Sequence, residues 1–175
     1  MGKRRLQRRV QALRPESPAV WIDDESNLPT ELTGSRRLLA TELEQRRLKL
    51  GFPPGPAELT GNTNPFELGL AQCVSLDKGC YLGQETMAKL AGRAGTKQQL
   101  RCWVSPHQLN SGDQLFDGET RAGVVTSRLE LESESWVGLA LIRRQYLSCG
   151  QLNGPNGQVV TLERPELFQD PPSPD

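Results

Sequence analysis

The sequence predicts an α+β protein in which helices and a loop come first and a small antiparallel β-barrel follows. Two observations support this prediction. Leucines recur at helical spacing in the first half, and after residue 95 short apolar runs alternate with turn residues. The 175 residues are enough to bury a core. We expect domains at residues 1–95 and 96–164, and a disordered tail rich in proline at 165–175.

The first segment, residues 1–14, is basic and carries no acidic side chain. Leu6, Val10 and Leu13 recur at spacings of four and three, which predicts a surface helix that ends near Pro15. An organelle transit peptide is also rich in arginine and poor in acid, although this segment has no serine or threonine. A cytoplasmic location is therefore expected, with an organelle matrix as the alternative.

A second helix is expected at residues 32–50, because leucines there supply one apolar face. Thr33 or Ser35 is the candidate N-cap, and Gly51 is expected to end the helix. Residues 51–56 carry too much proline and glycine for a helix and predict a shaped loop. The leucines of the predicted face are Leu38, Leu39, Leu43, Leu48 and Leu50.

Five apolar runs in the second half are expected to form antiparallel strands, since turn residues separate them. So many strands in so short a span favour a small barrel or sandwich. Turns are expected at residues 110–113, 117–118 and 153–157. The strands are expected at residues 100–104, 114–116, 122–126, 136–142 and 158–162.

Charge and cysteine content exclude several classes of protein. The 21 basic and 21 acidic residues cancel, so there is no strong nucleic-acid signal, and no apolar run approaches the roughly 18 residues that span a membrane. Four widely spaced cysteines without a Cys-x-x-Cys pair indicate reduced thiols and match no familiar iron–sulfur spacing. His107 is the single histidine, so we expect it on the surface and expect no metal site.

Residues 75–86 place a thiol, an ammonium group, an amide and a carboxylate around two glycines, which let the backbone approach a ligand. A short helix is expected at 84–91, closed by Gly92, so Cys80 precedes a helix N-terminus that favours thiolate. In an extended segment Lys78 would stand beside Cys80, and we therefore predict a reactive Cys80. The alternative is structural: Cys80 and Tyr81 are buried apolar groups beside a tight turn.

The octapeptide Lys78-Gly-Cys-Tyr-Leu-Gly-Gln-Glu85 resembles the KGCYxGQE signature of the YgfZ family of folate-binding proteins, which is related to the glycine-cleavage T protein. Residues 47–59 and 65–67 resemble the family's loop and its P-x-E motif. Residues 123–127 and 139–143 resemble strands of its C-terminal barrel. The resemblance covers about residues 47–162. Because family members are longer, the chain is expected to be N-terminally truncated, with residues 1–95 forming a partial GcvT/YgfZ-like folate-binding domain.

The resemblance implies a folate-binding accessory protein that supports iron–sulfur cluster assembly or repair and tRNA modification. Tetrahydrofolate is the implied cofactor, and iron–sulfur proteins or their assembly factors are the implied partners, with a partner chain or self-association completing the fold. The alternatives are an aminomethyltransferase of the T-protein type or an inactive binding remnant, so enzymatic activity stays open. The implied catalytic residues are Cys80 and Lys78, and the implied folate-binding residues are Lys78, Gly79, Cys80, Tyr81, Gly83, Gln84 and Glu85.

The side chains of the octapeptide suit distinct tasks. Lys78 can pair with a carboxylate of the folate tail or stabilise the thiolate, and Gln84 can offer a donor and an acceptor to a planar ring. Glu85 is expected to hold Lys78 in place. Glu58 and Glu67 are weaker candidates as supporting carboxylates, and we expect both to be exposed loop acids.

Overall fold

The computed structural model describes residues 9–10, 19–20, 34–52, 54–91, 95–132 and 134–172. The chain forms two units, Met1–Leu39 and Ala40–Asp175. In the first unit, β1 (Arg9–Val10) pairs antiparallel with β2 (Ala19–Val20). The predicted helix is therefore wrong at residues 9–10, where the β-branched Val10 suits a strand. The rest of that predicted helix lies outside the described residues.

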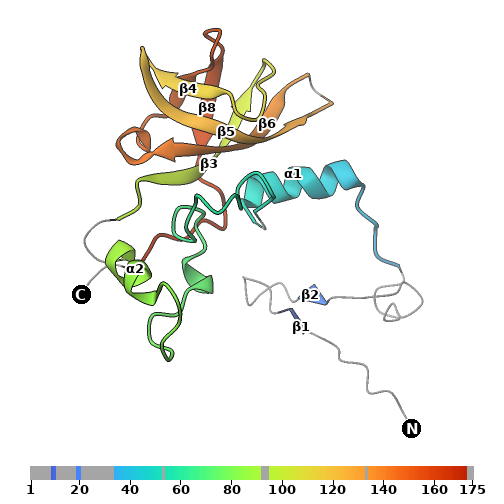
Figure 1. Cartoon of the computed structure of the whole chain (residues 1–175). Helices are drawn as coiled ribbons and strands as arrows, with labels where there is room; N and C mark the ends of the chain where they lie inside the picture. The colour runs from blue at the N-terminus through green and yellow to red at the C-terminus, as the bar shows by residue number, and fades with distance from the viewer. Residues whose placement is uncertain are drawn as a thin grey trace. The chain divides into compact units, whose positions relative to one another are not determined.

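The second unit is built on a closed antiparallel barrel with the strand order β3-β6-β5-β4-β7-β8 (Figure 1). This confirms the predicted barrel, and each predicted strand overlaps an observed one. Strand β7 was not predicted, because it is three residues long and buries one apolar side chain. The strands are β3 (Gln98–Ser105), β4 (Gln114–Asp117), β5 (Thr120–Glu130), β6 (Trp136–Arg143), β7 (Gln151–Asn153) and β8 (Val159–Glu163).

Strand β6 is apolar on both faces. Ala140 and Ile142 belong to the cluster inside the barrel, whereas Leu139 and Leu141 belong to a second cluster outside it. Successive side chains of a strand point to opposite faces, so a continuous apolar run indicates a strand that is covered on both sides. The outer face of the barrel is therefore a packing surface for the rest of the unit.

Trp103 is the largest side chain buried in the barrel interior and is 0% exposed. Its indole nitrogen donates a hydrogen bond to the Leu139 carbonyl at 3.1 Å. Trp103 pairs with Gly138 across β3 and β6, and a Cβ atom at Gly138 would lie 2.6 Å from the indole nitrogen. A glycine is required opposite this tryptophan, because any side chain would collide with the ring.

Helix α1 (Ala40–Leu50) packs against the barrel through Leu48 (Figure 1). Gly51 ends the helix as predicted, with a φ of 69° and its N–H bonded to the Arg47 carbonyl at 2.9 Å. The predicted start is wrong, because residues 34–39 are not helical and Ser35 therefore caps nothing; Thr33 lies outside the described residues. Of the predicted leucine face, Leu48 alone is buried among the described residues.

The C-terminal segment, residues 165–172, packs on the outer cluster, although its composition led us to expect disorder. Phe168 is 7% exposed and lies against Gly69, where a Cβ atom would approach the ring to 2.4 Å. Leu70 and Gln169 form an isolated parallel bridge. One aromatic anchor thus orders a segment that carries several prolines; residues 173–175 lie outside the described part.

The octapeptide belongs to a segment that leaves the barrel after residue 70 and returns at β3. It contains η3 (Ala71–Cys73), a bend at 76–79 and the short helix α2 (Gln84–Lys89). Helix α2 starts where predicted, and Gly92 lies outside the described residues. Every residue from 71 to 91 is exposed or half-buried. Within the described ranges, no helix is long and apolar enough to cross a membrane.

Candidate functional site

The signature loop, residues 75–86, brings the predicted site residues together on the surface beside α2 (Figure 1). Lys78, Gly79 and Cys80 are exposed, and Tyr81 is half-buried. Leu82 is fully exposed. The structural alternative for Cys80, a small buried apolar group, therefore does not hold. The loop thus exposes the Lys78 ammonium group and the Cys80 thiol.

Gln84 ties the signature loop together. Its amide nitrogen donates to the carbonyls of Leu76 at 2.8 Å and Lys78 at 3.3 Å, and its amide oxygen accepts from the Tyr81 N–H at 3.4 Å. Gly83 precedes the helix with a φ of 89°, a conformation that favours glycine. Both ends of the Gln84 amide are engaged within the loop, so this side chain shapes the loop.

Replacing Gln84 with alanine is expected to loosen the loop and leave the barrel intact. Hydrogen exchange at residues 76–81 should accelerate, while the free energy of unfolding should change by less than about 1 kcal/mol, because Gln84 lies outside both apolar clusters. Native-state hydrogen exchange measures both effects. Thr86→Ala, a change of an exposed side chain in the same helix, is the control; equal acceleration in both variants would contradict this role.

Lys78 does not stand beside Cys80 in an extended strand, because the chain bends at residues 76–79. The Lys78 ammonium group instead lies 5.5 Å from the centroid of the Tyr81 ring, a cation–π distance. The extended geometry predicted for this pair is wrong, and a reactive Cys80 stays a prediction. The Tyr81 hydroxyl oxygen is buried and has no hydrogen-bond partner within the described residues.

Glu85 pairs with Lys89 at 2.7 Å, so its predicted pairing with Lys78 is wrong. The two residues are one helical turn apart on α2, a spacing that places their side chains on the same face. Both are exposed, and such a pair contributes little stability. Glu85 is therefore accessible in the first turn of α2.

Glu58 and Glu67 are buried, so the predicted exposure of both is wrong. Glu58 is 0% exposed and accepts hydrogen bonds from the Gly55 N–H at 2.7 Å and the Ser127 hydroxyl at 2.6 Å. Arg47 lies 3.5 Å from the same carboxylate. Glu58 therefore fastens the loop after α1 to strand β5. This role is structural, and long-range contacts that the sequence does not display produce it.

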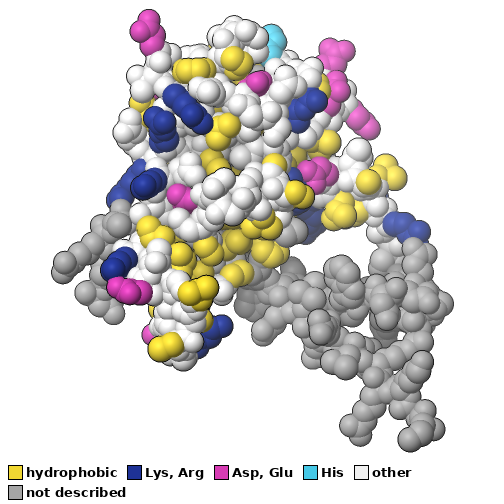
Figure 2. Space-filling model, viewed as in Figure 1, with side chains coloured by type: hydrophobic (Ala, Val, Ile, Leu, Met, Phe, Trp, Pro, Cys, Tyr) yellow, Lys and Arg dark blue, Asp and Glu magenta, His cyan; other side chains and the backbone are white. Residues whose placement is uncertain are grey.

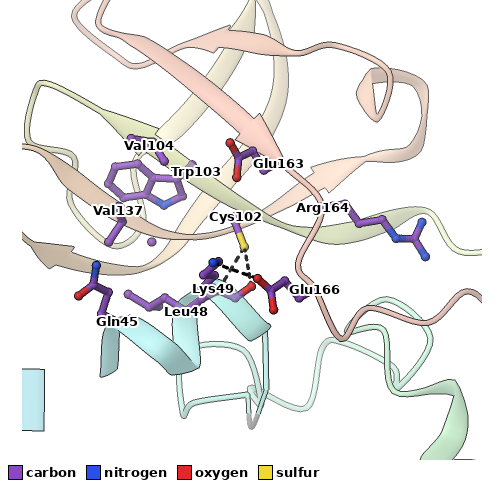
Figure 3. Close-up of a pocket in the computed structure, with 11 residues that line it drawn as sticks. Gln45, Leu48, Lys49, Cys102, Trp103, Val104, Val137, Glu163, Arg164 and Glu166 are labelled. Carbon is purple, nitrogen blue, oxygen red and sulfur yellow. Dashed lines mark hydrogen bonds and ion pairs between the residues drawn. The ribbon is translucent and has the colours of Figure 1, made fainter. Parts of the chain in front are cut away.

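A cavity of about 240 Å³ lies between α1 and strands β3, β6 and β8 (Figure 3). Cys102 points into it and donates its S–H to the Leu48 carbonyl at 3.2 Å. Burial raises the pKa of the Cys102 thiol to about 12, and nearby Glu163 adds to the effect. Cys102 is thus neutral at physiological pH, which makes this cavity a poor site for thiol chemistry.

Cys102 is expected to resist alkylation in the native protein. With a pKa of about 12, roughly one thiol in ten thousand is ionised at pH 8. Iodoacetamide followed by peptide mass spectrometry should label the exposed Cys73 and Cys80 first, and Cys102 only after unfolding in urea. Native labelling of Cys102 at the rate of Cys73 would contradict the buried, neutral thiol.

A second cavity, of about 410 Å³, lies at the start of β3 and the end of β6, beside the loop that carries Asn62 and Glu67. Lys97, Arg143 and Arg144 line it together with Glu67, which is 6% exposed. The sequence did not indicate this group, because Glu67 and Arg144 are far apart along the chain. In the described part of the chain, no group of three His, Cys, Asp or Glu side chains is placed to hold a metal ion, and His107 is exposed.

Comparison with known proteins gives one partial match. No family model matches the chain. Over 134 residues the chain is 34% identical to an Arabidopsis thaliana protein described as "Putative transferase, chloroplastic". The match covers 74% of this chain and 31% of that protein, so the chain spans about a third of the relative's length. The chain is therefore similar to part of a protein described as a transferase.

Proposed function

We propose that this chain is a folate-binding protein of the GcvT/YgfZ type that supports iron–sulfur cluster assembly or repair. The observation that carries the proposal is the octapeptide signature together with its position. Lys78, Gly79 and Cys80 lie exposed on a loop whose shape Gln84 fixes from within. A loop held in one conformation loses less entropy when it binds a ligand.

The signature loop forms one wall of the proposed tetrahydrofolate site. The Tyr81 ring, with the Lys78 ammonium group over it, offers a planar apolar surface next to a cation. The Tyr81 hydroxyl supplies a hydrogen-bonding group that has no partner within the described residues. Cys80 precedes Tyr81 in the chain and is exposed, so it can contact a bound ring. These groups suit a ligand that has a flat heterocycle with polar edges.

The exposed loop needs a second wall. Leu82 is fully exposed at the centre of the signature, and no residue from 71 to 91 is buried. A fully exposed leucine in a binding loop favours cover by another surface. We propose that chain outside residues 71–91 or a partner protein supplies that surface. Iron–sulfur proteins or their assembly factors are the proposed partners.

An aminomethyltransferase of the T-protein type is the second candidate, and the description of the Arabidopsis relative as a transferase favours it. In that reaction tetrahydrofolate takes a one-carbon unit from an aminomethylated carrier, and ammonia leaves. The assay is folate-dependent release of ammonia from such a carrier. If release of ammonia requires both this chain and tetrahydrofolate, the aminomethyltransferase becomes the leading candidate function. The relative's chloroplastic description likewise keeps an organelle matrix as the alternative to the cytoplasm.

Equilibrium binding of tetrahydrofolate to the purified chain tests the proposed site. Isothermal titration should show specific binding, and Lys78→Ala should weaken it about tenfold by removing a charge-assisted contact. Cys80→Ala should weaken it less, because a thiol donates only weak hydrogen bonds. The controls are Lys49→Ala and Cys73→Ala, which remove an exposed ammonium group and an exposed thiol outside the octapeptide. Absent binding, or equal losses in variants and controls, would refute the site.

A further inference from the structure

Three cationic side chains line the cavity of about 410 Å³ at the start of β3 and the end of β6. They are Lys97, Arg143 and Arg144, and Glu67 is the acid that faces them there. The remaining lining consists of amide side chains, which can donate hydrogen bonds. In the view of Figure 2, several Lys and Arg side chains lie on the surface above the position of α2. The cavity therefore carries a net positive charge.

The backbone holds these cations in place. Arg144 follows β6, and its N–H donates to the Lys97 carbonyl at 2.9 Å, which joins the two cationic residues directly. Arg143 pairs with Gln98 across β3 and β6, and its guanidinium group donates to the Arg121 carbonyl at 3.0 Å. The arrangement thus follows from the barrel register and does not depend on a flexible loop.

Gly95 makes room for the Arg144 side chain. A Cβ atom at Gly95 would lie 2.5 Å from a guanidinium nitrogen, and the glycine has a φ of 61°. With two arginines and one lysine against one acid, the lining favours an anionic ligand over a neutral one. Guanidinium groups bind carboxylates through paired hydrogen bonds, so a carboxylate ligand fits this lining.

Residues on both sides of the signature segment along the chain line the cavity. Glu67 precedes the signature segment and Lys97 follows it, and the Leu100 N–H joins the two flanks by a hydrogen bond to the Glu67 carbonyl at 2.8 Å. Lys78, our first candidate for the folate tail, instead lies over the Tyr81 ring. We infer that this basic cavity binds the carboxylates of the folate glutamate tail, while the signature loop contacts the ring; the inference rests on the proposed function.

The test compares three probes on the full 175-residue chain by isothermal titration. They are tetrahydropteroate, which lacks the glutamate tail, tetrahydrofolate, and tri-γ-glutamyl tetrahydrofolate. Tetrahydrofolate should bind about tenfold more tightly than the tailless probe, and added salt should reduce this advantage. Extra glutamates should strengthen binding further.

Substitutions in the cavity test whether it is the part of the protein that binds the glutamate tail. In Lys97→Gln with Arg143→Gln the tail advantage should fall below about threefold, while affinity for tetrahydropteroate stays unchanged. Arg128→Gln, an exposed arginine on β5 outside the cavity, is the control, and thermal melts check that each variant folds. Equal binding of all three probes, or a tail advantage that survives the double substitution, would overturn the inference and leave the proposed function standing. Failure of every probe to bind would refute both.

Discussion

Replacing Glu58 with alanine is expected to lower the free energy of unfolding by about 3 kcal/mol. The carboxylate is 0% exposed, and its removal leaves the Gly55 N–H and the Ser127 hydroxyl without their acceptor. Arg47 also loses an acidic neighbour. Urea unfolding, followed by circular dichroism, measures the loss.

The matched control is Glu44→Ala, which removes the other carboxylate beside Arg47. Glu44 is 37% exposed, so its loss should lower the free energy of unfolding by less than about 1 kcal/mol. Arg47 holds the pKa of Glu44 below its usual range. The stability from this pair is therefore present above the unfolded pKa of Glu44 and disappears as the pH falls through the folded pKa. Equal losses in both variants would contradict the clamp at Glu58.

Phe168→Ala is the second large effect, with an expected loss of about 3–4 kcal/mol from a vacated apolar site. Phe168 packs with Leu48 and Leu68 in the outer cluster, and the guanidinium groups of Arg101 and Arg164 lie 5.3 and 4.8 Å from its ring centroid. Urea unfolding again gives the value. The ring anchors the C-terminal segment, so cleavage by a protease between residues 165 and 172 should also accelerate.

The control for Phe168 is Leu167→Ala, its half-buried neighbour. The Leu167 N–H donates to the Leu50 carbonyl, and alanine keeps that bond, so the loss should be about 1 kcal/mol. An unchanged stability of Phe168→Ala would show that the segment is as disordered as its composition suggests. Such a result would also remove the reason for a glycine at position 69.

The barrel was predictable because its signals are local. The turn glycines Gly112, Gly118 and Gly157 all have a positive φ, and the apolar runs between turns form strands. The burial of β6 on both faces was not predicted, although its continuous apolar run is typical of such a strand. Strand β7 escaped prediction because three residues carry no periodicity. Strand β7 pairs with β4 and β8, and these pairings close the barrel.

The errors concern contacts between distant residues. Glu58 meets Ser127, 69 positions away, and Phe168 meets Gly69, so composition suggested an exposed acid and a disordered tail. The leucines around α1 suggested a longer helix with a broad apolar face. In the structure Leu48 packs against the barrel, whereas Leu38, Leu39 and Leu43 are exposed. Tertiary packing decides these cases, and a single sequence does not display it.

The candidate site, too, was predictable in its local sequence and not in its side-chain contacts. The octapeptide was recognisable from its residues, and the structure gathers it in one exposed loop. The side-chain pairs within it were not predictable, because Lys78 meets Tyr81 across a bend and Glu85 meets Lys89 along a helix. The basic cavity joins Lys97 to Arg144 through the barrel register, which the sequence does not reveal.

Protection of Cys80 by folate tests the central claim most directly. The chain is alkylated with iodoacetamide, with and without saturating tetrahydrofolate, and labelling of Cys80 and Cys73 is followed by mass spectrometry. Both thiols are exposed, and Cys80 alone of the two lies in the octapeptide. We expect bound folate to slow labelling of Cys80 about tenfold or more and to leave Cys73 unchanged, because a bound ligand covers the sulfur. Unchanged labelling of Cys80 at saturating folate would contradict a folate site at the signature loop.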